Sequence, residues 1–215
     1  MFITGSSLLG LAASLLVFAM VTRNGSTDPG SQATSLLQTG TPPERRQAAD
    51  LLAQIGDQRA VPALAQALRD ADALVREAAE RALWNVWHRS GIPDVDARLY
   101  EGIIAMQRRA FEQATALFTA VIEMAPSFAE GYNKRATAYY MMQDFEQSLS
   151  DCDRTIALNP LHFGALSGAG LCQLGLHNLP KALEYFERAL AVNPHMQQIQ
   201  RYVEDIKQFL RDQSL

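Results

Sequence analysis

Asp151 to Pro160 reads DCDRTIALNP, and the Asn-Pro pair that ends it returns as Asn193-Pro194 at the end of ERALAVNP. Counting back from Pro160 by the same 34 residues reaches Pro126, at the end of TAVIEMAP. Each proline follows an apolar helical pattern, and proline ends helices because it lacks an N–H and disfavours helix in the residue before it. A fixed period of this length, present three times, indicates an array of helical repeats.

The three copies share columns of residues when they are counted from Val95, Ala129 and Phe163. Small residues occupy the eighth and twentieth positions, where closely crossing helices need room for their backbones. These are Gly102, Ala136 and Gly170, and Ala114, Ser148 and Ala182. Mostly large apolar residues occupy the seventeenth and twenty-fourth positions: Phe111, Phe145 and Leu179, and Phe118, Cys152 and Phe186. The columns predict one helical hairpin per copy, with the same packing point each time.

These columns and their closing prolines resemble the tetratricopeptide repeat family over residues 95–194. The resemblance implies three repeats, 95–128, 129–162 and 163–196, each a pair of antiparallel helices. The expected helices are 95–107 with 111–124, 130–142 with 145–158, and 164–175 with 179–192. Residues 195–212 carry Ile199, Val203, Ile206 and Leu210 at helical spacing, so we expect a last helix that caps the open end of the array.

In this family the first helix of every repeat faces a concave surface, so the resemblance also implies a protein-binding face. Its inward positions include small and polar residues such as Glu130, Gly164 and Ser167. The side chains that we expect to contact a peptide or an amphipathic helix are Leu99, Ile103, Met106, Asn133, Thr137, Tyr140, Met141, Leu171 and Leu174. The alternative is that some of them pack against Trp84, Trp87 or the last helix.

The co-chaperone branch of the family grips peptide carboxylates with a clamp of Lys, Asn and Arg side chains. The matching positions here hold Leu99, Ile103, Lys134, Gly164 and Gly168, so the clamp is absent. The phrase YNKRATAYY does resemble the co-chaperones locally, and we expect its Arg135 to pack its stem and pair its head with a carboxylate. The sequence therefore argues against the capture of chaperone tails.

A second kind of repeat, with a period of 31 residues, precedes the three copies described above. Arg45, Ala48, Leu52 and Ile55 return as Arg76, Ala79, Leu83 and Val86. The string IGDQRAVPALAQALRDADALVREAAERAL, within residues 43–90, resembles the HEAT-like repeats first noted in phycobilisome lyases. The resemblance implies stacked helices that contact other proteins: one that opens at Pro43 and stops at Gly56, one over 60–68, and one from near Ala73. Lyase chemistry does not follow, because those enzymes use long arrays and this segment holds one and a half units.

The first residues of the chain suggest a membrane. Residues 2–22, FITGSSLLGLAASLLVFAMVT, carry no charge, and as a helix they are long enough to cross a hydrocarbon layer of ~30 Å. We predict a membrane anchor at residues 1–23, with a cleaved signal peptide as the alternative. Arg23 favours the cytoplasmic side for the rest of the chain, and a periplasmic or lumenal location stays open. The Gly-, Ser- and Thr-rich residues 24–42 predict a flexible linker.

Composition and motifs give no support for catalysis or nucleic-acid binding. The formal charge of -4, from 19 basic and 23 acidic side chains, provides no electrostatic attraction to phosphates. Cys152 and Cys172 lack metal-ligand spacing and predict buried free thiols, with a disulfide as the weaker alternative. The four histidines lie at helix ends or turns, where imidazole commonly meets terminal carbonyls. We therefore predict no enzyme activity, no cofactor and no metal site.

The sequence as a whole predicts an all-α chain: a membrane segment, a HEAT-like α-solenoid, three tetratricopeptide hairpins and a capping helix. Its predicted role is that of a membrane-tethered scaffold, an adaptor or assembly factor that binds a peptide or helix of a membrane-associated protein. Nucleic acid and small-molecule substrates are not expected. Alternative roles are a permanent structural subunit of a membrane complex or an accessory to bilin attachment, since one fold serves many ligands.

Overall fold

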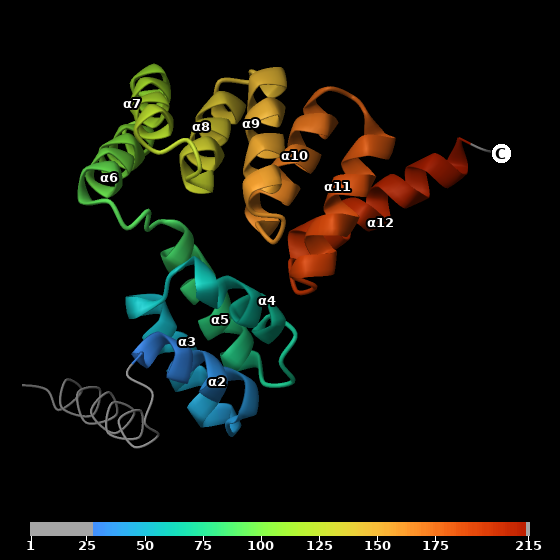
Figure 1. Ribbon diagram of the computed structural model, residues 1–215. Coiled ribbons are helices and arrows are strands. Elements are labelled where there is room, and N and C mark those ends of the chain that lie inside the picture. The colour runs from blue at the N-terminus through green and yellow to red at the C-terminus, as the bar shows by residue number, and fades with distance from the viewer. Residues whose placement is uncertain (1–27, 214–215) are drawn as a thin grey trace, which may run out of the picture. The chain divides into compact units, whose positions relative to one another are not determined.

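The computed structural model describes residues 28–213, in which all regular secondary structure is helical (Figure 1). The membrane anchor predicted for residues 1–23 lies outside this range. Among the helices of the described part, none combines the length and apolar character needed to cross a membrane. The chain divides into two compact units between Val86 and Trp87.

The first unit contains four α-helices and one short 3₁₀ segment within the described range. They are α2 (Pro29–Thr39), α3 (Pro42–Ile55), η2 (Gln58–Ala60), α4 (Val61–Ala67) and α5 (Ala73–Trp87). The start of α3 has a capping box, in which the Glu44 carboxylate accepts the backbone N–H of Thr41 at 2.8 Å. The helices predicted from Pro43, over 60–68 and from Ala73 are confirmed as α3, α4 and α5.

The flexible linker predicted for residues 24–42 is wrong over most of its length, because residues 29–39 form α2. Asp28 caps this helix, and its Oδ1 accepts the Gly30 N–H at 3.1 Å. Pro29 fits the first helical turn, where its missing N–H costs nothing. Ala33 and Leu37, which lie one turn apart, are buried because α2 packs on α3 and α4. The Asp-Pro-Gly sequence therefore starts a helix instead of making an isolated turn.

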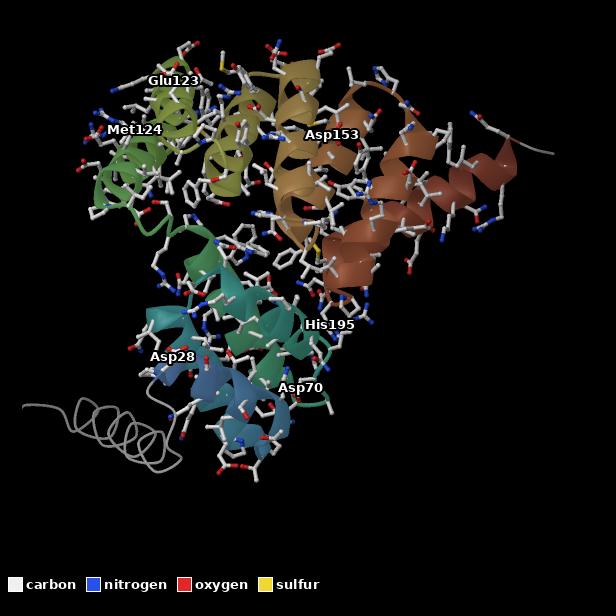
Figure 2. The ribbon with its side chains drawn as sticks, in the orientation of Figure 1. Asp28, Asp70, Glu123, Met124, Asp153 and His195 are labelled. Atoms are coloured by element: carbon white, nitrogen blue, oxygen red, sulfur yellow. The ribbon has the colours of Figure 1, made fainter. Side chains whose placement is uncertain are left out.

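Two arginines show the 31-residue repeat in three dimensions. The Arg45 guanidinium donates to the Gly40 carbonyl at 2.7 Å, and the Arg76 guanidinium donates to the Ala71 carbonyl at 3.0 Å. Each arginine thus holds the carbonyl five residues before it, in the turn that leads into its own helix. Arg45 also donates two hydrogen bonds to the carboxylate of Asp70, which is labelled in Figure 2.

The second unit contains three helical hairpins and a last helix. The hairpins are α6 (Pro93–Gln107) with α7 (Phe111–Met124), α8 (Ala129–Met141) with α9 (Phe145–Leu158), and α10 (Phe163–Gly175) with α11 (Leu179–Val192), followed by α12 (Gln197–Asp212). Each helix from α6 to α12 lies beside the next (Figure 1). The predicted helices agree with these bounds to within two residues.

The packing point predicted from the small-residue column is present in each hairpin. A Cβ on Gly102 would overlap the Phe118 ring, and a Cβ on Gly170 would overlap the Phe186 ring. In the second hairpin the corresponding residues are Ala136 and Cys152, both buried in one core cluster. In the first and third hairpins the phenylalanine ring therefore packs on a glycine. In the second hairpin the smaller cysteine thiol is combined with an alanine.

Polar contacts tie successive helices of the second unit together. Arg135 donates two hydrogen bonds to the Asp151 carboxylate at 2.7 and 2.8 Å, so its predicted pairing with a carboxylate is confirmed. The Tyr185 hydroxyl on α11 donates at 2.6 Å to Asp153 on α9, which is labelled in Figure 2. At the C-terminal end, α12 packs on α11 and buries Ile199, Val203 and Ile206.

Candidate functional site

A hollow of about 190 Å³ opens between the second and third hairpins. Three helices line it, and we refer to it as the α8–α10 hollow. The lining residues are Asn133, Ala136, Thr137 and Tyr140 of α8, Ser148 and Cys152 of α9, and Gly164, Ser167, Gly168 and Leu171 of α10. Thr137 is exposed, so the hollow is reached from the surface at the α8 side.

The hollow lies where the second hairpin departs from the first and third. Phe118 and Phe186 place a fully buried ring at the position where this hairpin has Cys152. A thiol fills much less volume than a phenyl ring. On the facing helix, a Cβ on Gly168 would lie only 3.3 Å from the Cys152 sulfur, so the missing side chain of Gly168 brings backbone and thiol close together. Small residues on α9 and α10 thus form the floor.

The polar side chains of the wall donate their hydrogen bonds within the protein. Ser148 Oγ donates to the Ala136 carbonyl at 2.8 Å, Thr137 Oγ1 to the Asn133 carbonyl at 2.9 Å, and Ser167 Oγ to the Gly164 carbonyl at 3.0 Å. Asn133 Nδ2 donates to Glu130 at 3.1 Å. Three hydroxyls and one N–H of Asn133 are thus engaged before any ligand arrives, which leaves the second Asn133 N–H and the Tyr140 hydroxyl as donors of the wall.

The residues predicted for a binding face differ in where they lie. Asn133, Thr137, Tyr140 and Leu171 line the α8–α10 hollow. Ile103 and Met106 are half-buried against the core of the first hairpin, and Leu174 is half-buried against the α11–α12 core. Met141 is exposed at the end of α8.

Leu99 does not belong to an open surface. It is 2% exposed and packs in the first hairpin's core with Val95, Phe118 and Val121. The expectation that Leu99 contacts a partner is therefore wrong, because this side chain is buried in the core of its own hairpin. Of the nine side chains predicted for the binding face, four line this hollow on the second and third hairpins.

A buried carboxylate lies beneath one wall of the hollow. Glu130 of α8 is 1% exposed, and its Oε2 contacts His162 Nε2 at 3.0 Å as well as Asn133. Its Oε1 lies 3.1 Å from Lys134 Nζ and 3.5 Å from His88 Nε2. Burial alone would raise the pKa of Glu130, but the His162 hydrogen bond and the nearby Lys134 outweigh it and hold this pKa at about 2.

His162 has a role that the sequence did not indicate. Histidine at a helix end was expected to meet terminal carbonyls, whereas the Nδ1 of His162 accepts the Ala165 N–H at 3.0 Å and caps the N-terminus of α10. This pattern assigns the ring proton to Nε2, which donates to Glu130. The Trp87 ring stacks on the imidazole with 4.1 Å between the ring centroids. Glu130 and His162 are adjacent only because successive hairpins stack.

Comparison with protein families assigns both parts of the chain. Residues 20–116 match HEAT repeats, and residues 133–196 match the tetratricopeptide repeat. The chain joins HEAT repeats to tetratricopeptide repeats. The HEAT match includes α2, which agrees with its packing on α3. It also reaches into α7, so the assignment of the α6–α7 hairpin to a first tetratricopeptide repeat stays a prediction, supported by its Gly102–Phe118 packing.

Known proteins share the tetratricopeptide part. A TPR repeat-containing protein of Rhizobium etli is 29% identical over 50% of this chain and 53% of its own length. The Hsp70-Hsp90 organizing protein of Triticum aestivum is 27% identical over 50% of this chain and 18% of its own. This chain therefore spans about half of the first relative and under a fifth of the second.

A solved structure has the same fold as the tetratricopeptide part. The first TPR of Spaghetti (RPAP3), bound to the HSP90 peptide SRMEEVD, superposes with a TM-score of 0.53 at 24% identity. The alignment covers 54% of this chain and 93% of that one. At this identity the likeness shows the fold alone, so the ligand of the present tetratricopeptide repeats has to be argued from their own residues.

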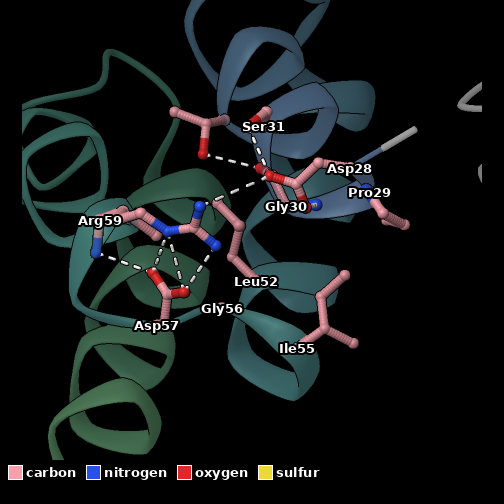
Figure 3. Close-up of a pocket in the computed structure, with 11 residues that line it drawn as sticks. Asp28, Pro29, Gly30, Ser31, Leu52, Ile55, Gly56, Asp57 and Arg59 are labelled. Carbon is pink, nitrogen blue, oxygen red and sulfur yellow. Dashed lines mark hydrogen bonds and ion pairs between the residues drawn. The ribbon is translucent and has the colours of Figure 1, made fainter. Parts of the chain in front are cut away.

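The HEAT repeats have a cavity of their own, of about 480 Å³, shown in Figure 3. Its wall includes Leu52 and Ile55 of α3, and Arg59 lies at its edge. The Arg59 guanidinium binds the Asp57 carboxylate at 2.8 Å and lies 4.0 Å from that of Asp28. The Ser31 hydroxyl and the Gly30 N–H hold the pKa of Asp28 below its ordinary value. At this edge one guanidinium thus faces two carboxylates, so a net negative charge remains.

The thiols of the tetratricopeptide part are free and buried, as predicted. Cys172 lies 3.1 Å from Ser148 Oγ, and its hydrogen bond with Cys152, together with burial, raises the pKa of the Cys152 thiol. Within residues 28–213, no group of His, Cys, Asp and Glu side chains is arranged to hold a metal ion. Cys152 and Gly168 were missed as residues of the site. Gly164 and Ser167 were placed on the inward face but left out of the predicted contacts, because the prediction favoured large apolar side chains. A small residue in a column of phenylalanines was the signal for the hollow.

Proposed function

We propose that the protein is a scaffold that holds a partner polypeptide against its tetratricopeptide repeats, across the α8–α10 hollow. The observation that carries this proposal is a surface-accessible hollow of about 190 Å³ between two hairpins of a repeat known for protein binding. Its wall combines the Tyr140 ring, Leu171 and polar side chains, a mixture typical of sites that bind part of another molecule. Catalysis is not part of the proposal.

The proposal includes attachment to a membrane. The uncharged residues 2–22 support it, since a helix of that length matches the hydrocarbon layer. The partner would then be a membrane protein, or one of its segments, that is held during assembly of a complex. An adaptor releases this partner, whereas a permanent subunit keeps it in constant stoichiometry.

The test is affinity purification of the full chain from detergent-solubilised membranes, followed by quantitative mass spectrometry. We expect Thr137→Arg to deplete one or a few membrane proteins strongly, because a cation at the rim would face a neutral wall and obstruct the hollow. Glu184→Lys, an exposed change on α11, is the matched control, and circular dichroism verifies the fold of both variants. An unchanged partner set for folded Thr137→Arg would remove the basis of the proposal.

A second candidate is capture of chaperone tails, because one relative is named as an Hsp70-Hsp90 organizing protein. The residues argue against it. Gly164 and Gly168 supply no cation where the co-chaperones have one, and Lys134 is already paired with Glu130 at 3.1 Å. A peptide carboxylate would therefore have no counter-ion in the hollow.

We accordingly expect no binding of the peptide SRMEEVD, which the first TPR of Spaghetti (RPAP3) binds. Fluorescence anisotropy of the labelled peptide against the full chain measures this directly. The triple variant Lys134→Asn, Gly164→Lys, Gly168→Arg supplies three of the five missing clamp side chains and is the comparison. Binding of SRMEEVD by the unaltered chain at micromolar concentration would make chaperone-tail capture the better function.

A further inference from the structure

The α8–α10 hollow has the size of one side chain. Its volume is about 190 Å³, and an apolar cavity of roughly 150 Å³ is large enough for a benzene molecule. The hollow would be partly filled if the second hairpin carried the phenylalanine that its neighbours have. Cys152 stands in place of that ring, so an occupant from outside can take part of the space that Phe118 and Phe186 fill in the other hairpins.

The wall of the hollow is electrically neutral. Among its described lining residues, none is an acid or a base of the Asp, Glu, Lys or Arg type. The raised pKa of Cys152 keeps its thiol protonated, and burial raises the pKa of Tyr140. The charged groups next to the wall are already engaged: Glu130 contacts Lys134, His88 and His162. Beside Cys152, Asp151 is paired with Arg135, and Asp153 accepts the Tyr185 hydroxyl. A charged group in the hollow would lose its hydration without gaining a counter-ion.

The hydrogen-bond donors of the wall do not favour an anion either. The hydroxyls of Ser148, Thr137 and Ser167 all donate to backbone carbonyls, and the Asn133 amide donates to Glu130. Apart from the Tyr140 hydroxyl and the second N–H of Asn133, a carboxylate or phosphate would have to displace these bonds in order to be solvated. Apolar groups need no such exchange, and they gain from the contact with Leu171, the Tyr140 ring and the Cys152 thiol.

We propose that the α8–α10 hollow receives one uncharged aliphatic or thioether side chain, that of leucine, isoleucine or methionine, from a polypeptide partner. This inference rests on the proposed function, since the partner supplies the side chain. The hollow then fixes the register of the bound segment, because one anchor residue must lie between α8 and α10. The polar rim of Thr137 and Asn133 would remain in contact with the backbone beside the anchor.

The thiol at the floor allows a test without knowledge of the partner. Alkyl methanethiosulfonates react with a thiolate by displacement of methanesulfinate, which leaves a mixed disulfide on the cysteine. In the full chain with Cys172→Ala, only Cys152 can react. We compare the neutral butyl reagent with the anionic sulfonatoethyl and the cationic trimethylammonioethyl reagents, each rate divided by that reagent's rate with glutathione. We expect the butyl reagent to be roughly tenfold or more faster than either charged reagent.

Two blocking variants show that the reagent enters through the hollow. Gly168→Leu fills the hollow from α10, and Thr137→Phe covers it from the exposed rim of α8, so each should slow the butyl reaction by roughly tenfold. The Cys152→Ser variant reports on Cys172, which does not line the hollow, and should react slowly. A decyl reagent exceeds the hollow and should gain no advantage over butyl.

Equal normalised rates for neutral and charged reagents, or butyl rates unaffected by both blocking variants when they are folded, would overturn the proposal. A decyl reagent faster than butyl would do so as well, since it would indicate a site for a lipid chain. No partner is present in this experiment. Its failure would therefore exclude the side-chain receptor while leaving the capture of partners, measured with Thr137→Arg, as a separate question.

Discussion

A single carboxylate, that of Glu130, joins four neighbouring side chains in the second unit. Its oxygens contact His162, Asn133, Lys134 and His88 within 3.5 Å. Removal of the carboxylate leaves buried donors without their acceptor, which is costly inside a protein. The pKa of about 2 in the folded protein, against an ordinary 4.5, means that folding favours the ionised form.

We therefore predict that Glu130→Gln lowers the free energy of unfolding by about 3 kcal/mol at pH 6. The sign of the pH dependence follows from the depressed pKa. The contribution of the carboxylate is complete above pH 4.5 and is lost as the pH falls from 4.5 toward about 2. Urea unfolding of wild type and variant at pH 6, 4 and 3 measures the contribution of this carboxylate to the free energy of unfolding. A difference that stays constant over this range would show that the ionised carboxylate is not what stabilises the fold.

Sequence and structure agree least at the level of single residues. Thr137 and Tyr140, which the sequence predicts for an inward face, line the α8–α10 hollow. Leu99, predicted for the same face at the repeat position of Asn133, is buried in the core of the first hairpin. The contact of Glu130 with His162 joins residues 32 apart, and no local pattern in the sequence signals it.

Within one hairpin, two positions on facing helices set the packing. Glycine is paired with phenylalanine in the first and third hairpins, and alanine with cysteine in the second. The residues at these positions should therefore be energetically coupled, since they share one packing contact. Helix bounds followed from the prolines and from these columns, whereas α2 was missed because Asp-Pro-Gly suits a turn as well as a helix start.

We predict that Cys152→Phe alone lowers the free energy of unfolding by about 1–3 kcal/mol, because the new ring meets the Cβ of Ala136. Ala136→Gly should recover at least ~1 kcal/mol of that loss, despite the poor helix propensity of glycine, because it removes this Cβ. The measurement is a double-mutant cycle by urea unfolding, with Gly170→Ala as the reverse change in the third hairpin. Strictly additive effects would show that the two positions do not share a packing contact.

At the scale of the molecule, the boundary between the units is not where the repeats alone would place it. The first repeat was counted from Val95, and α6 begins at Pro93, yet the second unit starts at Trp87. Trp87 is 2% exposed, stacks on His162 and lies 5.2 Å from the Phe163 ring between centroids. His88 contacts Glu130. Trp87 and His88, which precede α6, thus pack within the second unit.

Two fragments of the second unit, 87–215 and 93–215, should differ in stability although both contain every helix from α6 to α12. We expect 93–215 to unfold at a lower temperature, with a free energy of unfolding lower by about 2–4 kcal/mol, because it lacks the buried Trp87 ring and the His88 contact. Thermal and urea unfolding, monitored by circular dichroism, compare the two fragments. Trp87→Ala in fragment 87–215 should reproduce most of the loss, since the ring accounts for most of the buried area. Equal stability of the two fragments would place Trp87 outside the second unit's cooperative core and return the boundary to the start of α6.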